Sequence, residues 1–130
     1  MDSKHVDHLF DGATWLAGNP LSAAEAREAV ASSFPGKPYC IVEEWTILRI
    51  DLTPDEIVRV HSTNQLPLFM FAHKVVEDSL GRFQPGDWVR SSMCVTFEGG
   101  VLFETKNTAY VLIGPGHEQT ASLKAIFSIF

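Results

Sequence analysis

The spacing of apolar residues changes along the chain, from a helical pattern near the N-terminus to strand-like runs after residue 38. Apolar side chains near the N-terminus follow the three-and-four spacing that lines one face of a helix. They are Val6, Leu9, Phe10, Ala13 and Leu16. The spacing predicts a helix within residues 1–19.

A second helix is predicted by a capping box. Ser22 is followed three residues later by Glu25, so that each side chain can accept a hydrogen bond from the backbone N–H of the other. The helix is expected from Ala23 to about Ser32. Two prolines and a glycine in residues 34–38 deny the backbone further helical hydrogen bonds and end it.

A second capping box occurs later in the chain. Thr53 is followed by Pro54 at the first helical position and by Glu56 three residues after the cap. We predict a short helix over residues 54–62. A strand over residues 57–61 is the alternative, because three of these residues are β-branched.

The longest strand signal runs from residue 39 to residue 52, where β-branched and aromatic residues occupy both parities. Glu43 and Glu44 interrupt it. Two adjacent acidic residues put one carboxylate on each face of a strand. This pattern is typical of an edge, of a bulge, or of a strand that leaves the core midway.

The remaining sequence alternates strand and turn signals, with strands expected over residues 66–76, 87–97, 101–106 and 108–113. Glu98-Gly99-Gly100 predicts a tight hairpin turn, and Gly114-Pro115-Gly116 predicts a chain-reversing turn that closes an antiparallel meander. A phosphate-binding loop needs several consecutive backbone N–H donors, and Pro115 has none. The segment of Gly114 to Gly116 is therefore not expected to bind phosphate. The last apolar residues, Leu123, Ile126, Phe127 and Phe130, have helical spacing.

Together these signals predict an α+β fold in a single domain of residues 1–130. Residues 1–37 would form a helical N-terminal layer, packed on a strongly bent antiparallel sheet of about five strands in residues 38–120. A small, partly open barrel is one form that such a sheet can take. Residues 121–130 form an apolar tail that either docks on the sheet or forms a patch for a second copy.

The charge disfavours some classes of function. Sixteen acidic and ten basic residues give a formal net charge of −6, the wrong sign for a general nucleic-acid binder. Residues 1–60 hold ten acids and five bases, and residues 61–130 hold six and five. The excess is therefore regional, and an acidic N-terminal half is suited to docking a basic partner.

Cysteine and histidine usage suggests neither a disulfide framework nor a metal centre. Cys40 and Cys94 both lie in apolar runs, as buried reduced thiols do. His5 and His8 lie one helical turn apart, but two ligands do not make a site. We expect no metal, no cofactor and no membrane segment, and a cytoplasmic protein.

Four residues are candidates for acid–base or hydrolytic chemistry. His61 and His73 flank an apolar run, Asp78 follows closely, and Arg90 lies in the next strand. A histidine could serve as the acid–base group and the arginine could stabilise negative charge, as in a small hydrolase or nuclease. The simpler interpretation is a polar sheet face with ordinary cross-strand pairs.

Trp88 and Arg90 are the first candidates for a binding surface, because they share one face of a strand and both residue types are frequent in interaction hot spots. An arginine that covers a buried tryptophan is the alternative. Glu43 and Glu44 are the acidic candidates for the same role.

Three segments carry a resemblance to a known family. They are AHKVVEDS from residue 72, GDWVRSS from residue 86 and ETKNTAYVLIGPG from residue 104. The sequence resembles an uncharacterised family of small bacterial and prophage-encoded domains, over about residues 40–120. The resemblance implies no activity, cofactor or catalytic residue, but it favours an accessory protein of a bacterial or phage genome.

The sequence therefore predicts a non-enzymatic interaction module that binds another, basic protein through the acidic half or the Trp88–Arg90 strand. The alternative is a small hydrolase or nuclease that uses His73 or His61 with Arg90. A homo-oligomer formed through the C-terminal tail is a third class.

Overall fold

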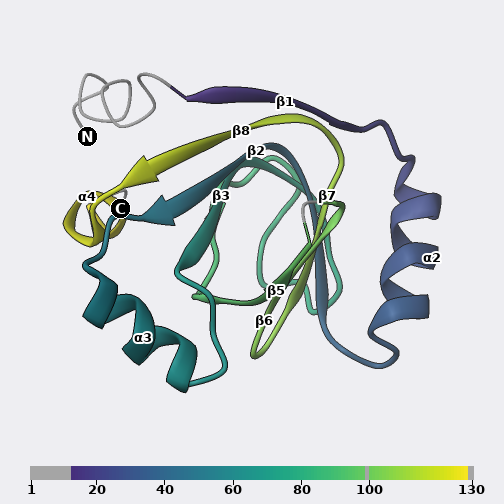
Figure 1. Cartoon of the computed structure of the whole chain (residues 1–130). Coiled ribbons are helices and arrows are strands. Elements are labelled where there is room, and N and C mark those ends of the chain that lie inside the picture. Colours follow the sequence, from purple (N-terminus) through teal and green to yellow (C-terminus); the bar gives the residue numbers. More distant parts are fainter. Residues whose placement is uncertain (1–12, 99, 129–130) are drawn as a thin grey trace.

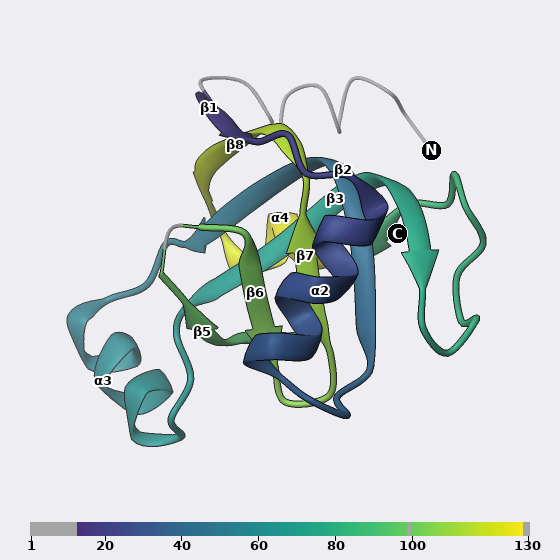
Figure 2. The same cartoon turned by 90° about the vertical axis from the view of Figure 1, so that its right-hand side faces the viewer.

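The computed structural model describes residues 13–98 and 100–128. Its elements follow one another as β1 (Thr14–Asn19), α2 (Ala23–Ser33), β2 (Tyr39–Ile50), α3 (Pro54–Ser62), β3 (Leu68–Asp78), β4 (Val89–Arg90), β5 (Cys94–Phe97), β6 (Leu102–Thr105), β7 (Ala109–Leu112), β8 (Gly114–Ala121) and α4 (Leu123–Phe127). The strands of the described residues form one bent sheet, with helices at its periphery (Figures 1 and 2).

Strand β2 is the centre of the sheet. One of its edges pairs with antiparallel β3 along most of its length. Its other edge pairs with parallel β7 up to Val42 and with parallel β8 from Trp45 onwards. The change of partner falls at Glu43 and Glu44, the acidic pair that interrupts the strand pattern, and Glu44 has a φ of 52°. The sheet therefore divides at this point into a β8–β1 branch and a β7–β6–β5 branch.

Gly114-Pro115-Gly116 is not a chain-reversing turn, so that prediction is wrong. Strands β7 and β8 run in the same direction along β2, with a bend between them at Gly114, whose φ is 74°. A glycine takes this left-handed conformation without steric cost. The segment therefore continues along β2 as the first residues of β8 and begins the β8–β1 branch.

The sheet also differs from the predicted one in size and pairing. It has eight strands in the described residues rather than about five, and β2 pairs in parallel with β7 and β8, so it is not purely antiparallel. It is open, and a single isolated bridge, Leu66–Cys94, joins β5 to the segment before β3 in the described chain. Parallel pairing between distant segments has no local sequence signal, whereas the expected β5–β6–β7 hairpins are present.

The predicted N-terminal helix is wrong over its described part, because residues 14–19 form strand β1. This strand pairs with antiparallel β8, for instance Trp15 with His117. Most of its side chains are exposed, so burial imposes no alternating pattern on its sequence. The positions of Val6, Leu9 and Phe10 lie outside the described residues.

Helices α2 and α3 begin at their predicted capping boxes. In each, the serine or threonine hydroxyl accepts a hydrogen bond from the N–H three residues later, and the glutamate carboxylate accepts one in return. Helix α2 buries Ala26 and Val30 against the outer face of β2 and β7. Helix α3 buries none of its residues and projects beyond the end of β2 (Figure 1).

Helix α4 docks the C-terminal tail on the sheet. Ile126 is fully buried among Leu48, Ile50, Phe69 and Phe71. Burial of one such aliphatic side chain contributes about 1.5–3 kcal/mol. The spacing of the tail therefore corresponds to a docked helix in the described residues, and Phe130 lies outside them.

The concave side of the sheet holds the largest core cluster, which includes Val42, Trp45, Ile47, Met70, Phe103 and Tyr110. Because α2 and α4 cover the opposite side of β2, this strand is buried on both faces. That explains its apolar residues on both parities.

Candidate functional site

The predicted Trp88–Arg90 surface is a cluster on the outer face of β3 and β4, which we call the aromatic patch. It consists of Phe69, Phe71 and His73 of β3, Trp88 and Arg90 of the β4 segment, and Phe127 of α4. Phe71 and Arg90 are direct cross-strand neighbours. The ring of Phe71 lies 4.8 Å from that of His73 and 5.9 Å from that of Trp88, measured between centroids.

Arg90 is packed between two aromatic rings. Its guanidinium carbon lies 4.8 Å from the centroid of Phe127 and 5.4 Å from that of Phe69, and Nη1 donates to the Ser91 carbonyl at 3.0 Å. Burial lowers the pKa of this guanidinium from its usual value of 12.5. The side chain is thus a positioned cation that holds α4 against β3.

Trp88 and Phe127 remain half-exposed in this patch, at 46% and 48% of their full accessible surface. His73 is exposed beside them. The alternative of a buried tryptophan covered by Arg90 is therefore not what the structure shows. The patch offers two large rings to solvent on one face.

Glu43 and Glu44 lie on β2, two strands away from β4. Glu43 registers with Lys74 of β3, and its Oε1 lies 3.9 Å from Lys74 Nζ. Glu44 is exposed at the point where β2 changes partner. The structure therefore places both acidic residues on the strand that pairs with β3, which carries three residues of the aromatic patch.

Asp78 lies apart from the patch and belongs to a structural ion pair. Its two carboxylate oxygens accept hydrogen bonds from Arg82 Nε and Nη2 at 3.1 and 2.7 Å, and Arg82 Nη1 donates to Thr108. Burial raises the pKa of Asp78, but the hydrogen bonds from Arg82 outweigh burial and hold this pKa below its usual 3.8. Arg82 thereby links the end of β3 and the loop after it to Thr108, the residue that precedes β7.

The four residues considered for catalysis do not come together. His73 and Arg90 belong to the aromatic patch, Asp78 pairs with Arg82, and His61 lies at the end of α3. His61 faces a separate cavity, which none of the other three lines. The geometry brings together Trp88, Arg90 and His73 but no acid–base pair.

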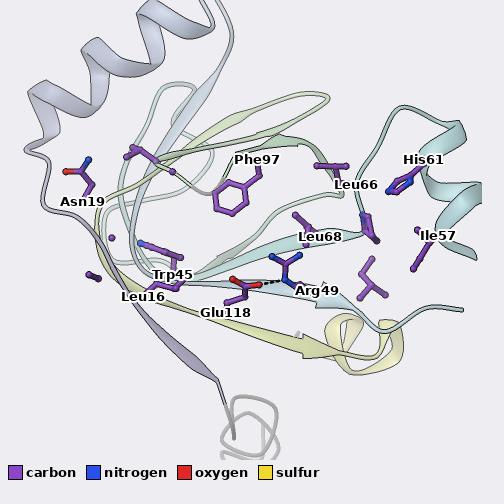
Figure 3. A pocket seen from close by; sticks show the side chains of 16 residues that line it. Leu16, Asn19, Trp45, Arg49, Ile57, His61, Leu66, Leu68, Phe97 and Glu118 are labelled. Atoms are coloured by element: carbon purple, nitrogen blue, oxygen red, sulfur yellow. Dashed lines mark hydrogen bonds and ion pairs between the residues drawn. The ribbon is translucent and has the colours of Figure 1, made fainter. Parts of the chain in front are cut away.

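A cavity of about 820 Å³ lies between the two branches of the sheet, over the second half of β2; we call it the β2 cavity (Figure 3). Its walls come from β1, β2, β8, the β5–β6 hairpin, α3 and the segment before β3. They include Leu16, Trp45, Ile50, Ile57, Leu66, Leu68, Phe97 and Val101, with Asn19, Arg49, His61 and Glu118 as polar members. Sequence reasoning did not find this cavity.

Arg49 and Glu118 form an ion pair in the wall of the β2 cavity. Arg49 Nε donates to Glu118 Oε1, from neighbouring strands β2 and β8. The one available sequence signal was Arg49 itself, because it shares the parity of inward-facing Trp45 and Ile47. Its partner is 69 residues away in the sequence, so the pair could not be predicted.

Both cysteines are free and buried, as expected. Burial raises the pKa of the Cys40 thiol to about 12, and it raises that of Cys94 to about 12. Within residues 13–98 and 100–128, no cluster of three or more His, Cys, Asp or Glu side chains is arranged to hold a metal ion. His5 and His8 lie outside these residues.

Comparison with known proteins identifies the family. Residues 17–128 match the family model described as "Domain of unknown function (DUF6957)". The chain belongs to the DUF6957 family. The match covers β1 from residue 17 through α4, and so includes the aromatic patch and nearly all of the β2 cavity. It confirms the predicted membership of an uncharacterised family.

The other comparisons add no activity. No curated protein and no solved structure matches the chain. None of the helices in the described part of this DUF6957 member has the length and apolar character needed to cross a membrane.

Proposed function

We propose that this DUF6957 protein is a small non-enzymatic interaction module that binds a basic protein through the aromatic patch and the neighbouring acidic residues of β2. The observation that carries the proposal is the pair of half-exposed rings, Trp88 and Phe127, in one cluster with Arg90, whose guanidinium lies against Phe127. Tryptophan and arginine dominate the hot spots of protein interfaces.

The fixed geometry of the patch favours binding. Arg90 contacts Phe69 and Phe127, and Trp88 contacts Phe71, so the side chains are already ordered before any partner arrives. Ordering a free side chain on binding costs about 0.5–1.5 kcal/mol, and a pre-ordered patch avoids much of this cost.

The charge of the chain favours a basic partner. The formal net charge is −6, and Glu43 and Glu44 adjoin the patch through β3. Lysine or arginine side chains on the partner would face these carboxylates, while apolar side chains cover Trp88 and Phe127. Such complementarity accelerates association and makes it dependent on salt.

The hydrolase or nuclease alternative has less geometric support. General acid–base catalysis needs the acid, the base and the charge-stabilising group within hydrogen-bonding reach of one substrate. The four candidates occupy three separate places: His61 lines the β2 cavity, His73 and Arg90 belong to the aromatic patch, and Asp78 is paired with Arg82. The resemblance to small bacterial and prophage domains, together with the composition, supports a cytoplasmic accessory protein of a bacterial or phage genome.

The test compares two tryptophans. The full chain, Trp88→Ala and Trp15→Ala are each immobilised and exposed to lysate of the organism that encodes the protein, and the retained proteins are identified by mass spectrometry. Trp15 is the matched control, because it is exposed on β1, at 62%, and lies outside the patch. We expect a basic protein in stoichiometric amount, retained by the full chain and by Trp15→Ala and lost with Trp88→Ala.

The purified partner is then titrated calorimetrically into the three proteins at low and high salt. The proposal requires weaker binding by at least tenfold for Trp88→Ala, and weaker binding at high salt for the full chain. Equal affinity for Trp88→Ala and Trp15→Ala would contradict it. So would light scattering that shows a dimer dissociated by Phe127→Ala, since a second copy would then occupy the patch.

A further inference from the structure

We propose that the β2 cavity binds a small amphipathic molecule whose apolar body ends in a carboxylate, with Arg49 as the residue that receives the carboxylate. This site is separate from the aromatic patch. The inference goes beyond the proposed protein-binding function and does not depend on it.

The size and walls of the cavity suit a small apolar ligand. Its volume of about 820 Å³ lies within the roughly 300–1,000 Å³ typical of small-molecule sites. Aliphatic and aromatic side chains from five separate segments form the walls, among them Leu16, Trp45, Leu68 and Phe97. An apolar body of the ligand would cover these side chains and release the water in contact with them.

The floor of the cavity is closely packed and hydrogen-bonded. The Trp45 indole is 3% exposed, and its Nε1 donates to the Gly114 carbonyl at 3.2 Å. A ligand would therefore enter a site whose shape exists beforehand, which lowers the entropy lost on binding.

Arg49 gives the cavity its polarity. Its Nε is used by Glu118, and Figure 3 shows the two terminal nitrogens turned away from Glu118, towards the side of the cavity where Leu68 and Phe97 lie. No described residue accepts a hydrogen bond from these terminal nitrogens. A guanidinium end of this kind matches the two oxygens of a carboxylate.

Glu118 makes the site selective for the orientation of the ligand. Its carboxylate holds Arg49 from the Nε side, so the terminal nitrogens are presented in one direction. The same carboxylate also partly neutralises Arg49, and a bound anion has to tolerate its negative charge. Arg49 therefore strengthens the binding of a carboxylate. Glu118 fixes the orientation of Arg49, but its negative charge weakens that binding. This relationship gives the two variants opposite expected effects.

The binding test uses Trp45 as an internal reporter. In a Trp15→Phe/Trp88→Phe double variant, Trp45 is the one tryptophan left, and it lines the cavity. Decanoate is titrated below its micelle concentration, with decanol and decyltrimethylammonium as uncharged and cationic controls. We expect a saturable change in Trp45 fluorescence with decanoate, a weaker change with decanol, and the weakest with the cation.

Two substitutions then test the assignment of the carboxylate. Arg49→Gln should weaken decanoate binding about tenfold, the loss of one charged hydrogen-bonding partner, while decanol binding stays unchanged. Glu118→Gln should strengthen decanoate binding a few-fold. Arg59→Gln, on the exposed side of α3 and outside the cavity lining, is the matched control and should bind like the unaltered protein.

Circular dichroism and urea melts establish that each variant is folded before its affinity is compared. No saturable response to decanoate in the double variant would overturn the proposal. Unchanged affinity in Arg49→Gln, weaker affinity in Glu118→Gln, or tighter binding of decyltrimethylammonium than of decanoate would each overturn it too. Because Trp88 is already replaced, none of these outcomes bears on the aromatic patch.

Discussion

The indole ring of Trp45 occupies the space in which residue 116 would carry a side chain. A Cβ placed on Gly116 would lie 2.3 Å from Trp45 Cδ2 and 2.4 Å from Cε2, well inside van der Waals contact. Trp45 and Gly116 are also paired across β2 and β8. The glycine therefore sets how closely β8, in the β8–β1 branch of the sheet, packs on Trp45 in the floor of the β2 cavity.

Gly116→Ala should destabilise the protein by about 1–3 kcal/mol, because the added methyl group has to displace a fully packed ring. Urea denaturation followed by circular dichroism measures this change. Gly100→Ala is the control, since nothing lies within 4 Å of its added Cβ. A loss of stability in the control equal to that of Gly116→Ala would show that the packing relationship is not the cause.

Asp78→Asn should lower the free energy of unfolding by about 1–2 kcal/mol at neutral pH, because it leaves the partly exposed Arg82 guanidinium without its carboxylate. The folded pKa of Asp78 is lowered. Its contribution is therefore present at neutral pH and is lost as the pH falls below 3.8 and through the folded value.

Urea melts at pH 7 and pH 3 check this dependence. The difference in stability between the unaltered protein and Asp78→Asn should shrink at the lower pH. Asp51→Asn, an exposed carboxyl at the end of β2, serves as the comparison and should change stability little at either pH. A difference for Asp78→Asn that is equal at both pH values would contradict the assignment.

Arg90→Lys should cost about 1 kcal/mol of stability although it keeps the charge. A lysine ammonium cannot stack as a plane between the rings of Phe69 and Phe127. Arg59→Lys on α3 is the matched control and should be neutral. Hydrogen exchange gives a local measure, because α4 amides should exchange faster in Arg90→Lys; unchanged α4 protection would argue against this role.

Cys40 and Cys94 should be inert in the native protein. Both thiols are buried, and their pKa values are raised to about 12, so the reactive thiolate is scarce at neutral pH. Alkylation with iodoacetamide at pH 8, followed by mass spectrometry, should label neither residue without denaturant and both in urea. Rapid labelling of either cysteine in the folded protein would be inconsistent with this burial.

Local signals in the sequence predicted local structure well. The capping boxes at Ser22 and Thr53 start α2 and α3, because a cap requires only residues three positions apart. The long apolar run became β2, and the interruption at Glu43 and Glu44 marks the change of partner strand. For the candidate site, the sequence identified Trp88 and Arg90, which the structure brings together with His73.

The predictions that were wrong concern segments whose structure depends on pairing with strands far away in the sequence. Residues 14–19 were expected in a helix. They form a strand because their backbone pairs with the edge of β8. The segment at Gly114 was expected to reverse the chain, and it continues along β2 instead. Neither the strand at residues 14–19 nor the course of β8 has a local sequence signal. Each depends on which strand lies next to the segment in the folded protein.

By itself, the sequence determined the starts of α2 and α3, the hairpins after residue 94, the long strand that became β2 and the excess of negative charge. Only the tertiary structure decided that the sheet divides, that a cavity opens between its branches, and that Arg49 meets Glu118 there. The physical reason is the sequence distance over which each effect acts. Helix caps, turns and hydrophobic periodicity involve residues that are only a few positions apart. A cavity is the space left between segments that the folded chain brings together from far apart.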